Sequence, residues 1–287
     1  MKKILSVLLC AVMLLTSACV LGSCGGDSAS GSGALKVIDI PLTSEEYAYA
    51  VAKGDAELLA SVNTFLAEIK GNGKFDEIIN KYFGDGEPTG VTSAAEDPSK
   101  DQLVVATNAG FEPFEYKEGD TYYGVDMEIM GLLAEYLGQE LVISNMEFES
   151  VCTSVAEGMC DIAAAGLTIT ETRKEILDFS DAYYNASQVL IVKGDDTTFD
   201  ACKTAEDVEA ILNTLGSDTK IGVQSGTTGQ FYVMGDEGWG FAGYGVECVP
   251  YEVGALAAQN LINGNVNYVV LDIAPAKAVV ENINAVN

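Results

Sequence analysis

The stretch DIAAAGLTITETR, residues 161–173, ends in the only arginine of the chain, Arg173. Its first five residues predict a short strand of small side chains, which let a ligand or another backbone approach closely. Lysine and arginine together number 15, so the chain otherwise uses lysine for its cations. A guanidinium can bind a carboxylate through two parallel hydrogen bonds. The stretch therefore predicts either a carboxylate site after a strand, or an arginine that pairs with a carboxylate on a neighbouring helix.

From residue 101 onward, short apolar runs alternate with segments of helical periodicity. Such alternation is typical of α/β folds, in which helices cover parallel sheets. Strands are predicted over residues 103–107, 141–143, 161–165, 189–192, 220–223 and 268–271, and helices over residues 127–137, 151–157, 205–215 and 255–262.

Hydroxyls, glycines, aromatic rings and one acid directly follow four of these strands. They lie in residues 107–114, 166–173 and 224–229, and at Asp272. Ligands of α/β folds bind at the carboxyl ends of the strands. A free α-amino acid needs a guanidinium and N–H donors for its carboxylate, an acid for its ammonium and rings for its side chain. The simpler explanation of each part is local: a threonine after a strand often caps a helix, and Asp272 could cap one beginning near Pro275.

Composition excludes several functional classes. The net charge of −28 disfavours binding to nucleic acid or to anionic lipid by charge. The chain has no histidine, which rules out a Ser-His-Asp triad, a Cys-His pair and histidine-ligated metals. No Cys-x-x-Cys pair indicates a metal, and no cofactor is expected. Cys152, Cys160, Cys202 and Cys248 are interpreted as small apolar residues, with a Cys202–Cys248 disulfide left open.

Residues 1–23 are predicted to be a lipoprotein signal peptide. Two lysines precede an apolar run that is too short to span a membrane comfortably. The following LGSC resembles a lipobox, which predicts lipidation of Cys24; Cys19 is a weaker candidate. Residues 24–34 read as a Gly/Ser tether. We expect an extracytoplasmic protein anchored to the outer face of the cell membrane, the alternative being an ordinary signal peptide with incidental cysteines.

The segment AGLTITETRKEILDFSDAYY, residues 165–184, resembles the extracytoplasmic amino-acid-binding proteins of ABC importers, the bacterial solute-binding proteins of family 3. Residues 107–114, 123–127, 223–230 and 269–272 extend the resemblance over nearly all of 101–287. It implies a type II fold of two α/β lobes, each a helix-covered sheet, joined by two hinge strands that close on ligand. It also implies a receptor, not an enzyme, with an importer permease as partner.

The stretch FDEIINKYFG, residues 75–84, has the apolar spacing of a helix and looks like the end of a domain. In the family, elements like those of residues 35–84 follow the strand that corresponds to 268–272, whereas here they come first. The resemblance therefore implies a circular permutant. The alternatives are a truncated copy followed by a partial one, a weak N-terminal mini-domain, or strand exchange between two chains.

Mapping the family onto the permuted order predicts the domain organisation. Lobe 1 would comprise residues 48–83 and 101–182, and lobe 2 residues 35–41 and 188–287. The hinges would be residues 42–47 and 183–187, with residues 84–100 as the linker that joins the usual termini of the family.

The resemblance also assigns roles to individual residues. Arg173 would bind the ligand carboxylate, with the Thr168 hydroxyl and the N–H groups of Thr168 and Thr228. Asp272 and the Gly166 carbonyl would hold the α-ammonium. The side chain of the ligand would be surrounded by Phe111, Phe148, Asn108, Ala165, Gln224 and Thr227. Family members that bind cationic amino acids often have an acid where this chain has Asn108, so a neutral amino acid is expected. The alternatives are a dehydratase of the prephenate or arogenate type and a ligand-sensing partner of a membrane receptor.

Overall fold

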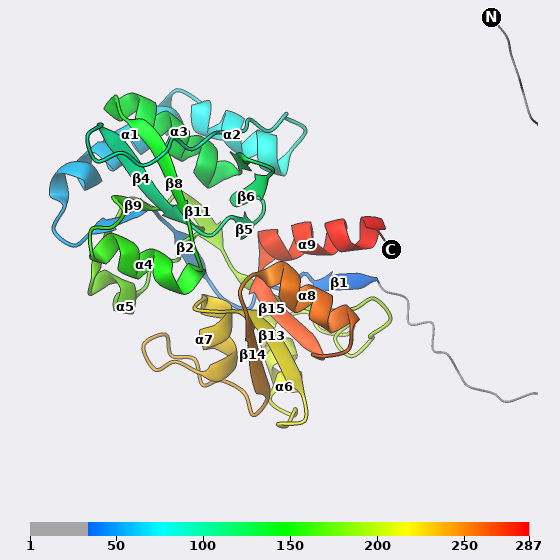
Figure 1. Ribbon diagram of the computed structural model, residues 1–287. Helices are drawn as coiled ribbons and strands as arrows, with labels where there is room; N and C mark the ends of the chain where they lie inside the picture. Colours follow the sequence, from blue (N-terminus) through cyan, green and yellow to red (C-terminus); the bar gives the residue numbers. More distant parts are fainter. Residues whose placement is uncertain (1–33, 287) are drawn as a thin grey trace, which may run out of the picture. The chain divides into compact units, whose positions relative to one another are not determined.

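The computed structural model describes residues 34–286, which form two helix-covered five-stranded sheets (Figure 1). Lobe 1 is the sheet of order β10-β3-β9-β4-β8 with its helices, and lobe 2 is the sheet of order β1-β12-β15-β13-β14 with its helices. The strands are β1 (Leu35–Ile38), β2 (Glu45–Tyr47), β3 (Ala50–Ala52), β4 (Gln102–Thr107), β5 (Gly110–Phe111), β6 (Glu115–Glu118), β7 (Thr121–Tyr123), β8 (Glu140–Asn145), β9 (Ile162–Ala163), β10 (Leu177–Phe179), β11 (Tyr184–Ala186), β12 (Gln188–Lys193), β13 (Lys220–Gln224), β14 (Glu247–Tyr251) and β15 (Tyr268–Asp272). The helices are α1 (Ala56–Gly71), α2 (Lys74–Phe83), α3 (Val125–Leu137), α4 (Phe148–Ala156), α5 (Glu171–Lys174), α6 (Ala205–Leu212), α7 (Thr228–Met234), α8 (Gly254–Ile262) and α9 (Ile273–Val286).

Each sheet contains one reversed strand, so the prediction of parallel sheets was incomplete. β4 pairs in parallel with β8 and β9, and β13 with β14 and β15. β3 and β12, in contrast, pair with both of their neighbours in the antiparallel sense. Each directly follows a hinge strand. A strand that arrives from the other lobe starts at the edge where the parallel strands end, so it must run in the opposite direction.

The strands β2 and β11 form a two-stranded antiparallel ribbon that crosses between the lobes. Tyr47 lies opposite Tyr184, and Glu45 lies opposite Ala186. The ribbon falls within the segments predicted to be hinges. Because successive side chains of a strand point to opposite faces, Glu45 and Tyr47 share one face, and both are buried.

The N-terminal elements do not form a separate mini-domain, because β1 joins the sheet of lobe 2 whereas α1 and α2 pack onto lobe 1. Helix α1 buries one face, and Ile78 of α2 is fully buried in the main core. The ring of Phe83, at the end of α2, contacts the rings of Phe114 and Tyr184 at centroid distances of 5.7 and 5.5 Å. Residues 75–83 therefore pack against α1 and against residues much later in the chain, such as Phe114 and Tyr184.

Residues 84–100 run from α2 to β4 without forming a helix or a strand of two or more residues. Val91 exchanges backbone hydrogen bonds with Tyr122, and the Ala94 N–H donates to the Leu141 carbonyl. The Ile143 N–H of β8 donates to the Ser93 hydroxyl at 2.8 Å. The segment thus covers the outer edge of β8.

One strand boundary and one helix boundary near residues 161–173 differ from prediction. The strand predicted over residues 161–165 is limited to Ile162–Ala163, because Gly166 has a left-handed φ of +51° and turns the chain away from the sheet. A Cβ at Gly166 would lie 2.7 Å from the Phe111 ring. The helix predicted from residue 151 begins earlier, at Phe148, so this ring faces the cavity from the first turn of α4.

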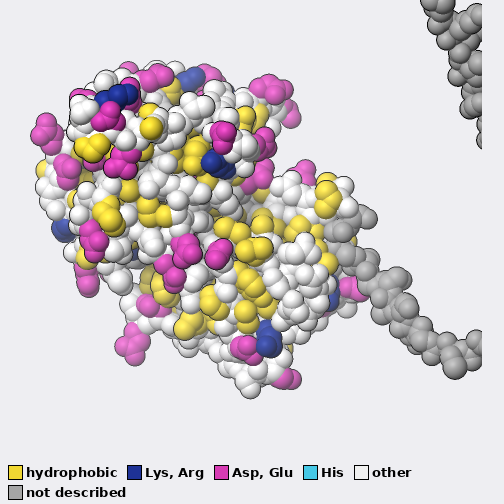
Figure 2. Space-filling model, viewed as in Figure 1, with side chains coloured by type: hydrophobic (Ala, Val, Ile, Leu, Met, Phe, Trp, Pro, Cys, Tyr) yellow, Lys and Arg dark blue, Asp and Glu magenta, His cyan; other side chains and the backbone are white. Residues whose placement is uncertain are grey.

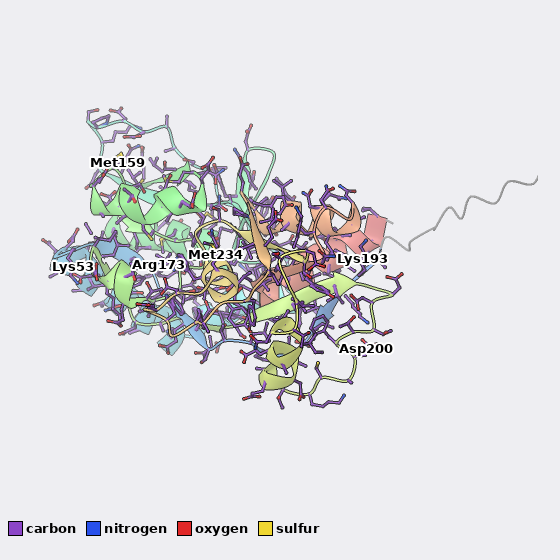
Figure 3. The ribbon with its side chains drawn as sticks, turned by 90° about the horizontal axis from the view of Figure 1, so that it is seen from below. Lys53, Met159, Arg173, Lys193, Asp200 and Met234 are labelled. Carbon is purple, nitrogen blue, oxygen red and sulfur yellow. The ribbon has the colours of Figure 1, made fainter. Side chains whose placement is uncertain are left out.

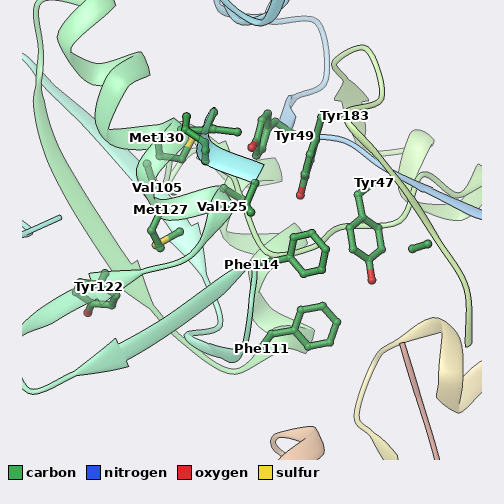
Figure 4. Close-up of a cluster of buried hydrophobic side chains, with 14 of the residues drawn as sticks. Tyr47, Tyr49, Val105, Phe111, Phe114, Tyr122, Val125, Met127, Met130 and Tyr183 are labelled. Atoms are coloured by element: carbon green, nitrogen blue, oxygen red, sulfur yellow. The ribbon is translucent and has the colours of Figure 1, made fainter. Parts of the chain in front are cut away.

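Aromatic side chains fill the core of lobe 1 next to the hinge. Figure 4 shows Tyr47, Tyr49, Phe114 and Tyr183 grouped there, and the rings of Tyr49 and Tyr183 stack at 4.5 Å. Lobe 2 has a separate buried cluster that includes Leu190 and Val223. Lobe 1 likewise has a cluster of its own around Ala163. A third buried cluster contains the hinge residue Tyr47 together with residues of both lobes, such as Met127 and Leu271.

The four cysteines between residues 34 and 286 are all unpaired, so the disulfide left open between Cys202 and Cys248 is not formed. Cys160 and Cys202 are buried, in line with their interpretation as small apolar residues. No helix in the described part of the chain is both long and apolar enough to cross a bilayer. The predicted signal peptide and Cys24 lie outside the described residues.

Candidate functional site

The carboxyl ends of strands from both sheets meet around one small cavity. Nine of the eleven residues singled out from the sequence line it. The other two adjoin it: Asn108 is hydrogen-bonded to a lining residue, and Ala165 belongs to the buried cluster of Phe148. The cavity encloses about 10 Å³, about the space of one water molecule. The lining residues are Phe111, Phe148, Gly166, Thr168, Arg173, Gln224, Thr227, Thr228 and Asp272.

Arg173 extends from the short helix α5 toward the start of α7 in lobe 2 (Figure 3). The Thr170 side chain caps α5 by accepting a hydrogen bond from the Arg173 N–H. The Arg173 guanidinium donates to the Thr168 carbonyl at 2.8 Å and to the Gly226 carbonyl at 3.3 Å. It lies 5.4 Å from the centre of the Phe148 ring. The bond to Gly226 connects the two lobes, whereas the bond to Thr168 stays within lobe 1.

No carboxylate among residues 34–286 lies within 4.0 Å of the Arg173 guanidinium. Burial lowers the pKa of Arg173. The alternative of an ion pair with a neighbouring helix therefore does not hold in the described part of the chain. Arginine has five N–H donors, and the two carbonyl bonds use two of them. The guanidinium can therefore bind an acidic group that enters the cavity.

Asp272 lies at the carboxyl end of β15 and is 5% exposed. The Tyr47 hydroxyl of the hinge ribbon donates a hydrogen bond to it. Burial, followed by the negative charge of Glu45, raises the pKa of Asp272 to about 7. Helix α9 starts at Ile273, earlier than the predicted start near Pro275. A carboxylate held in this way is suited to an ammonium group, which would favour its ionised form.

The hydroxyl of Thr168 donates to Glu45 Oε2 at 2.8 Å. The hydroxyl of Thr228 donates in turn to Thr168 Oγ1, at 3.4 Å. A hydroxyl has one proton, so the Thr168 hydroxyl cannot also donate to a ligand carboxylate in this arrangement. The predicted role of that hydroxyl therefore requires it to leave Glu45. The Thr227 hydroxyl donates to the Gln224 carbonyl at 2.8 Å, which ties the end of β13 to α7.

Glu45 was missed by the sequence reasoning, although it is 4% exposed and bonded to the site. Besides Thr168, it accepts hydrogen bonds from the Thr43 hydroxyl at 2.6 Å and from Gln188 Nε2 at 3.1 Å. It thus connects the hinge to both lobes. Tyr47 was missed as well. The alternation of Glu45, Glu46 and Tyr47 could have revealed both, because it puts the first acid on the same face as the tyrosine.

The side chains of Asn108 and Gln224 form a hydrogen-bond relay between the lobes. Asn108 Nδ2 donates to the Met146 carbonyl at 2.7 Å, and Gln224 Nε2 donates to Asn108 Oδ1 at 3.0 Å. Gln224 Oε1 is buried and has no hydrogen-bond partner among the described residues. The relay therefore leaves one polar atom of this pair, an acceptor, without a partner.

A second cavity, of about 310 Å³, adjoins the other side of Arg173. Cys152 and Phe148 of lobe 1 line it together with Trp239 of lobe 2, the only tryptophan of the chain. The indole stacks on the ring of Phe241 at 5.5 Å. Arg173 thus lies between two cavities, each of which is also lined by residues of lobe 2.

The sequence profile of the bacterial extracellular solute-binding proteins, family 3, matches residues 103–274. The chain belongs to this family. Among curated relatives it is similar to the arginine-binding extracellular protein ArtP of Bacillus subtilis, with 37% identity over 37% of this chain and 42% of ArtP. It is also 30% identical to a probable histidine-binding protein of Neisseria gonorrhoeae, over 69% of this chain and 68% of that protein. The chain thus spans less than half the length of the first relative.

Solved structures of amino-acid-binding proteins share the fold. The holo ArgBP of T. maritima matches with a TM-score of 0.54 and 32% identity, over 63% of this chain and 74% of that one. An ancestral amino-acid-binding protein described as a precursor of cyclohexadienyl dehydratase matches with a TM-score of 0.53 and 30% identity, over 64% and 74%. The two lobes are therefore those of a type II amino-acid-binding protein, as the sequence predicts.

Proposed function

We propose that the protein is an extracytoplasmic receptor that binds a free amino acid between its lobes and delivers it to an ABC importer. The observation that carries this proposal is the pairing of Arg173 and Asp272 around one cavity, the first without a carboxylate partner in the described residues. A free amino acid carries the two complementary charges. The named ligands of the relatives, arginine and histidine, are amino acids as well.

In this proposal, Arg173 binds the ligand carboxylate through two parallel hydrogen bonds, together with the N–H groups of Thr168 and Thr228. Asp272 and the Gly166 carbonyl hold the α-ammonium. The rings of Phe111 and Phe148 contact the ligand side chain. The remaining contacts come from Asn108, Ala165, Gln224 and Thr227.

A ligand must open this cavity before it can enter, because the enclosed space is far smaller than an amino acid. The bond from Arg173 to the Gly226 carbonyl and the relay between Asn108 and Gln224 both join the lobes. Separation of the lobes breaks these bonds, and the ribbon of β2 and β11 is the connection about which they turn.

A thermal-shift screen against the twenty amino acids tests the receptor proposal. Ligand at 100 times its dissociation constant raises stability by about 2.7 kcal/mol. We expect a shift for a subset of amino acids that is lost in Arg173→Ala and Asp272→Ala. A folded protein that shifts with none of them would contradict the proposal.

An enzymatic alternative, a dehydratase of the prephenate or arogenate type, has one structural observation in its favour. The ancestral neighbour is described as a dehydratase precursor. A dehydratase needs a general acid, and this chain has no histidine. We propose that the protein is not an enzyme. Sustained turnover of prephenate or arogenate by the purified protein would reverse that choice.

We also propose that the chain is a circular permutant with the lobe, hinge and linker ranges predicted above. The last helix meets the first strand: the Leu35 N–H donates to Asn284 Oδ1 at 2.9 Å, and Asn284 Nδ2 donates to the Leu35 carbonyl at 2.9 Å. A family chain that continued from α9 into β1 would pass through this contact. The family profile also starts at residue 103, after the linker.

A rearranged gene tests the permutation. Residues 101–286 followed by residues 35–83 should fold as a monomer and bind the same ligand with an unchanged dissociation constant. The natural order should be monomeric in light scattering too. A natural chain that is folded only as a dimer would favour strand exchange between two chains.

The lipid anchor completes the proposal. Lipidation at Cys24 would hold the receptor at the outer face of the membrane, near an importer permease or a membrane receptor that senses its loaded form. In a bacterial host, Cys24→Ala should move the protein from the membrane fraction to the soluble fraction without changing ligand affinity. Retention of the variant in the membrane fraction would contradict the assignment.

A further inference from the structure

The strand ends of the two lobes face one another in the same order along the cleft. In lobe 2, Asp272 ends β15, Gln224 ends the neighbouring β13, and Glu252 follows β14 at the edge. In lobe 1, Gly166 follows β9, Asn108 follows β4, and Glu147 follows the edge strand β8. Gly166 and Asp272 line one cavity, and Glu147 and Glu252 line another, with the hydrogen bond from Gln224 to Asn108 between them.

This order gives the cleft a direction. Neighbouring strands lie about 4.8 Å apart, so the end of β14 is about 10 Å from the end of β15. A ligand whose ammonium binds Asp272 can extend its side chain past Gln224 toward the edge strands. Only a long side chain reaches that far.

The relay fixes which atom of Gln224 meets such a side chain. A backbone carbonyl only accepts hydrogen bonds, so the Met146 carbonyl requires the amide nitrogen of Asn108. The oxygen of Asn108 then requires the nitrogen of Gln224. Turning either amide would bring two acceptors or two donors together. Gln224, 1% exposed and lining the cavity, therefore presents an unpartnered carbonyl oxygen, which calls for a donor on the ligand.

The charged residues around the cavity also favour a positively charged ligand, because acids outnumber cations there. Arg173 is the only cation among the described lining residues. Asp272 lines the cavity as well, and buried Glu45 is bonded to its Thr168. A zwitterionic amino acid pairs its carboxylate with Arg173 and its ammonium with Asp272, which leaves Glu45 without a cation. A ligand with one additional positive charge would balance the site.

The space beyond Gln224 continues this pattern. A cavity of about 170 Å³ shares Phe148 with the first and is lined by Glu147, Glu149 and Glu252. Across residues 34–286, no lysine or arginine forms an ion pair with any of the three. Figure 2 shows acidic side chains in the middle of this face, where the upper and lower sheets meet.

We infer that the ligand is a cationic amino acid, whose guanidinium or ammonium side chain donates to Gln224 Oε1 and ends among Glu147, Glu149 and Glu252. This inference rests on the proposed receptor function and names its substrate class. It revises the expectation of a neutral ligand. That expectation took Asn108 as the residue that meets the ligand side chain, but both polar atoms of its amide are used by Met146 and Gln224.

Calorimetric titration of the purified protein tests the inference with matched ligands. L-Citrulline has nearly the shape of L-arginine but a neutral urea in place of the guanidinium. L-Lysine, L-ornithine, L-glutamine and L-norleucine complete the set. We expect at least one cationic ligand to bind about tenfold or more tightly than each neutral ligand, because only it places a positive charge beside the three glutamates.

Neutralising the three acids tests where the positive charge goes. The triple variant Glu147→Gln, Glu149→Gln and Glu252→Gln changes exposed side chains, and we expect it to lose most of the preference for arginine over citrulline. It should bind citrulline as the parent protein does.

A second triple variant makes the same change in net charge elsewhere. Glu118→Gln, Glu157→Gln and Asp195→Asn are exposed and line none of the cavities described above. This control should keep the full preference for arginine.

Three other results would overturn the inference. A neutral amino acid that binds as tightly as the cationic ones would refute it while the receptor proposal stands. Equal loss of preference in both triple variants would show a general field effect and no site at the three glutamates. A folded protein that binds no amino acid would refute the receptor proposal, and this inference with it.

Discussion

The two ends of the cleft use different means of recognition. At one end lie Arg173 and Asp272, two ionisable side chains of opposite charge that are complementary to the groups that every amino acid carries. At the other end, Asn108 and Gln224 are neutral amides. Which of their atoms are already bonded decides whether they offer a hydrogen-bond donor or an acceptor to a ligand. In the function proposed above, the first end would select a class of molecule, and the second would select within that class. Changes at the first end should therefore affect all ligands alike, whereas changes at the second should separate them.

The largest expected effect is at the charged end. Arg173→Lys keeps the positive charge but loses the planar pair of donors. Disturbing a buried, hydrogen-bonded charge pair costs about 2–5 kcal/mol, or roughly 30-fold and more in affinity. Calorimetry should show a similar loss for every amino acid that binds. Unchanged affinity would show that Arg173 does not bind the ligand. A loss confined to ligands with long side chains would show that Arg173 contacts the ligand side chain and not its carboxylate.

The pH dependence of binding should come next in size. The ligand ammonium requires ionised Asp272, whose pKa is raised to about 7 in the free protein by burial and by Glu45. Above pH 7, Asp272 is mostly ionised and can bind the ammonium. Below pH 7, Asp272 must first lose its proton. Affinity should therefore fall about tenfold between pH 8 and pH 6, equally for short and long ligands.

The residual binding of Asp272→Asn provides the control for this pH effect. Its affinity should be weak and nearly independent of pH over the same range. An affinity of the parent protein that rises toward pH 6 would contradict the role of Asp272.

Glu45→Gln should have a smaller and more selective effect. The change removes one negative charge near the cavity while keeping an oxygen that can accept hydrogen bonds from Thr168 or Gln188. Loss of a nearby charge should weaken arginine about fivefold and citrulline much less. Glu46→Gln, on the exposed face of the same strand, is the matched control and should leave both constants unchanged. Equal weakening of both ligands would make Glu45 a hinge residue without influence on ligand charge.

The smallest expected effect is at the amide end. Gln224→Leu removes the free acceptor, which is worth about one net hydrogen bond, or about threefold in affinity for a long donor side chain. The affinity for L-alanine as a ligand should not change, because its side chain does not reach Gln224. If the affinities for L-arginine and L-alanine fall together, the hydrogen bond between Asn108 and Gln224 stabilises the closed lobes and does not contribute to ligand selection.

The charged end could be predicted from the sequence because its residues are unusual. A lone arginine and an acid directly after a strand stand out in any α/β chain, and nine of eleven selected residues line the cavity. Glu45 was missed because it enters from the hinge strand, which follows no crossover helix. The reversed direction of β3 and β12 was missed for the same reason: it is set by the passage between lobes, which periodicity does not record.

The orientation of the amides could not be predicted at all. Asn108 and Gln224 are 116 positions apart, and only their hydrogen bond shows that they meet. Which atom stays free depends on the Met146 carbonyl, a backbone group that any residue would supply. The expectation of a neutral ligand used the side chain at position 108 alone, without this hydrogen bond.

Trp239 provides an optical probe of this molecule. As the only indole of the chain, it belongs to lobe 2 but lines a cavity with Phe148 and Arg173 of lobe 1. Its surroundings change when the lobes separate, so its emission should shift as they do. Stopped-flow fluorescence can thus time the opening of the unlabelled protein, and can distinguish a ligand that waits for opening from one that induces it.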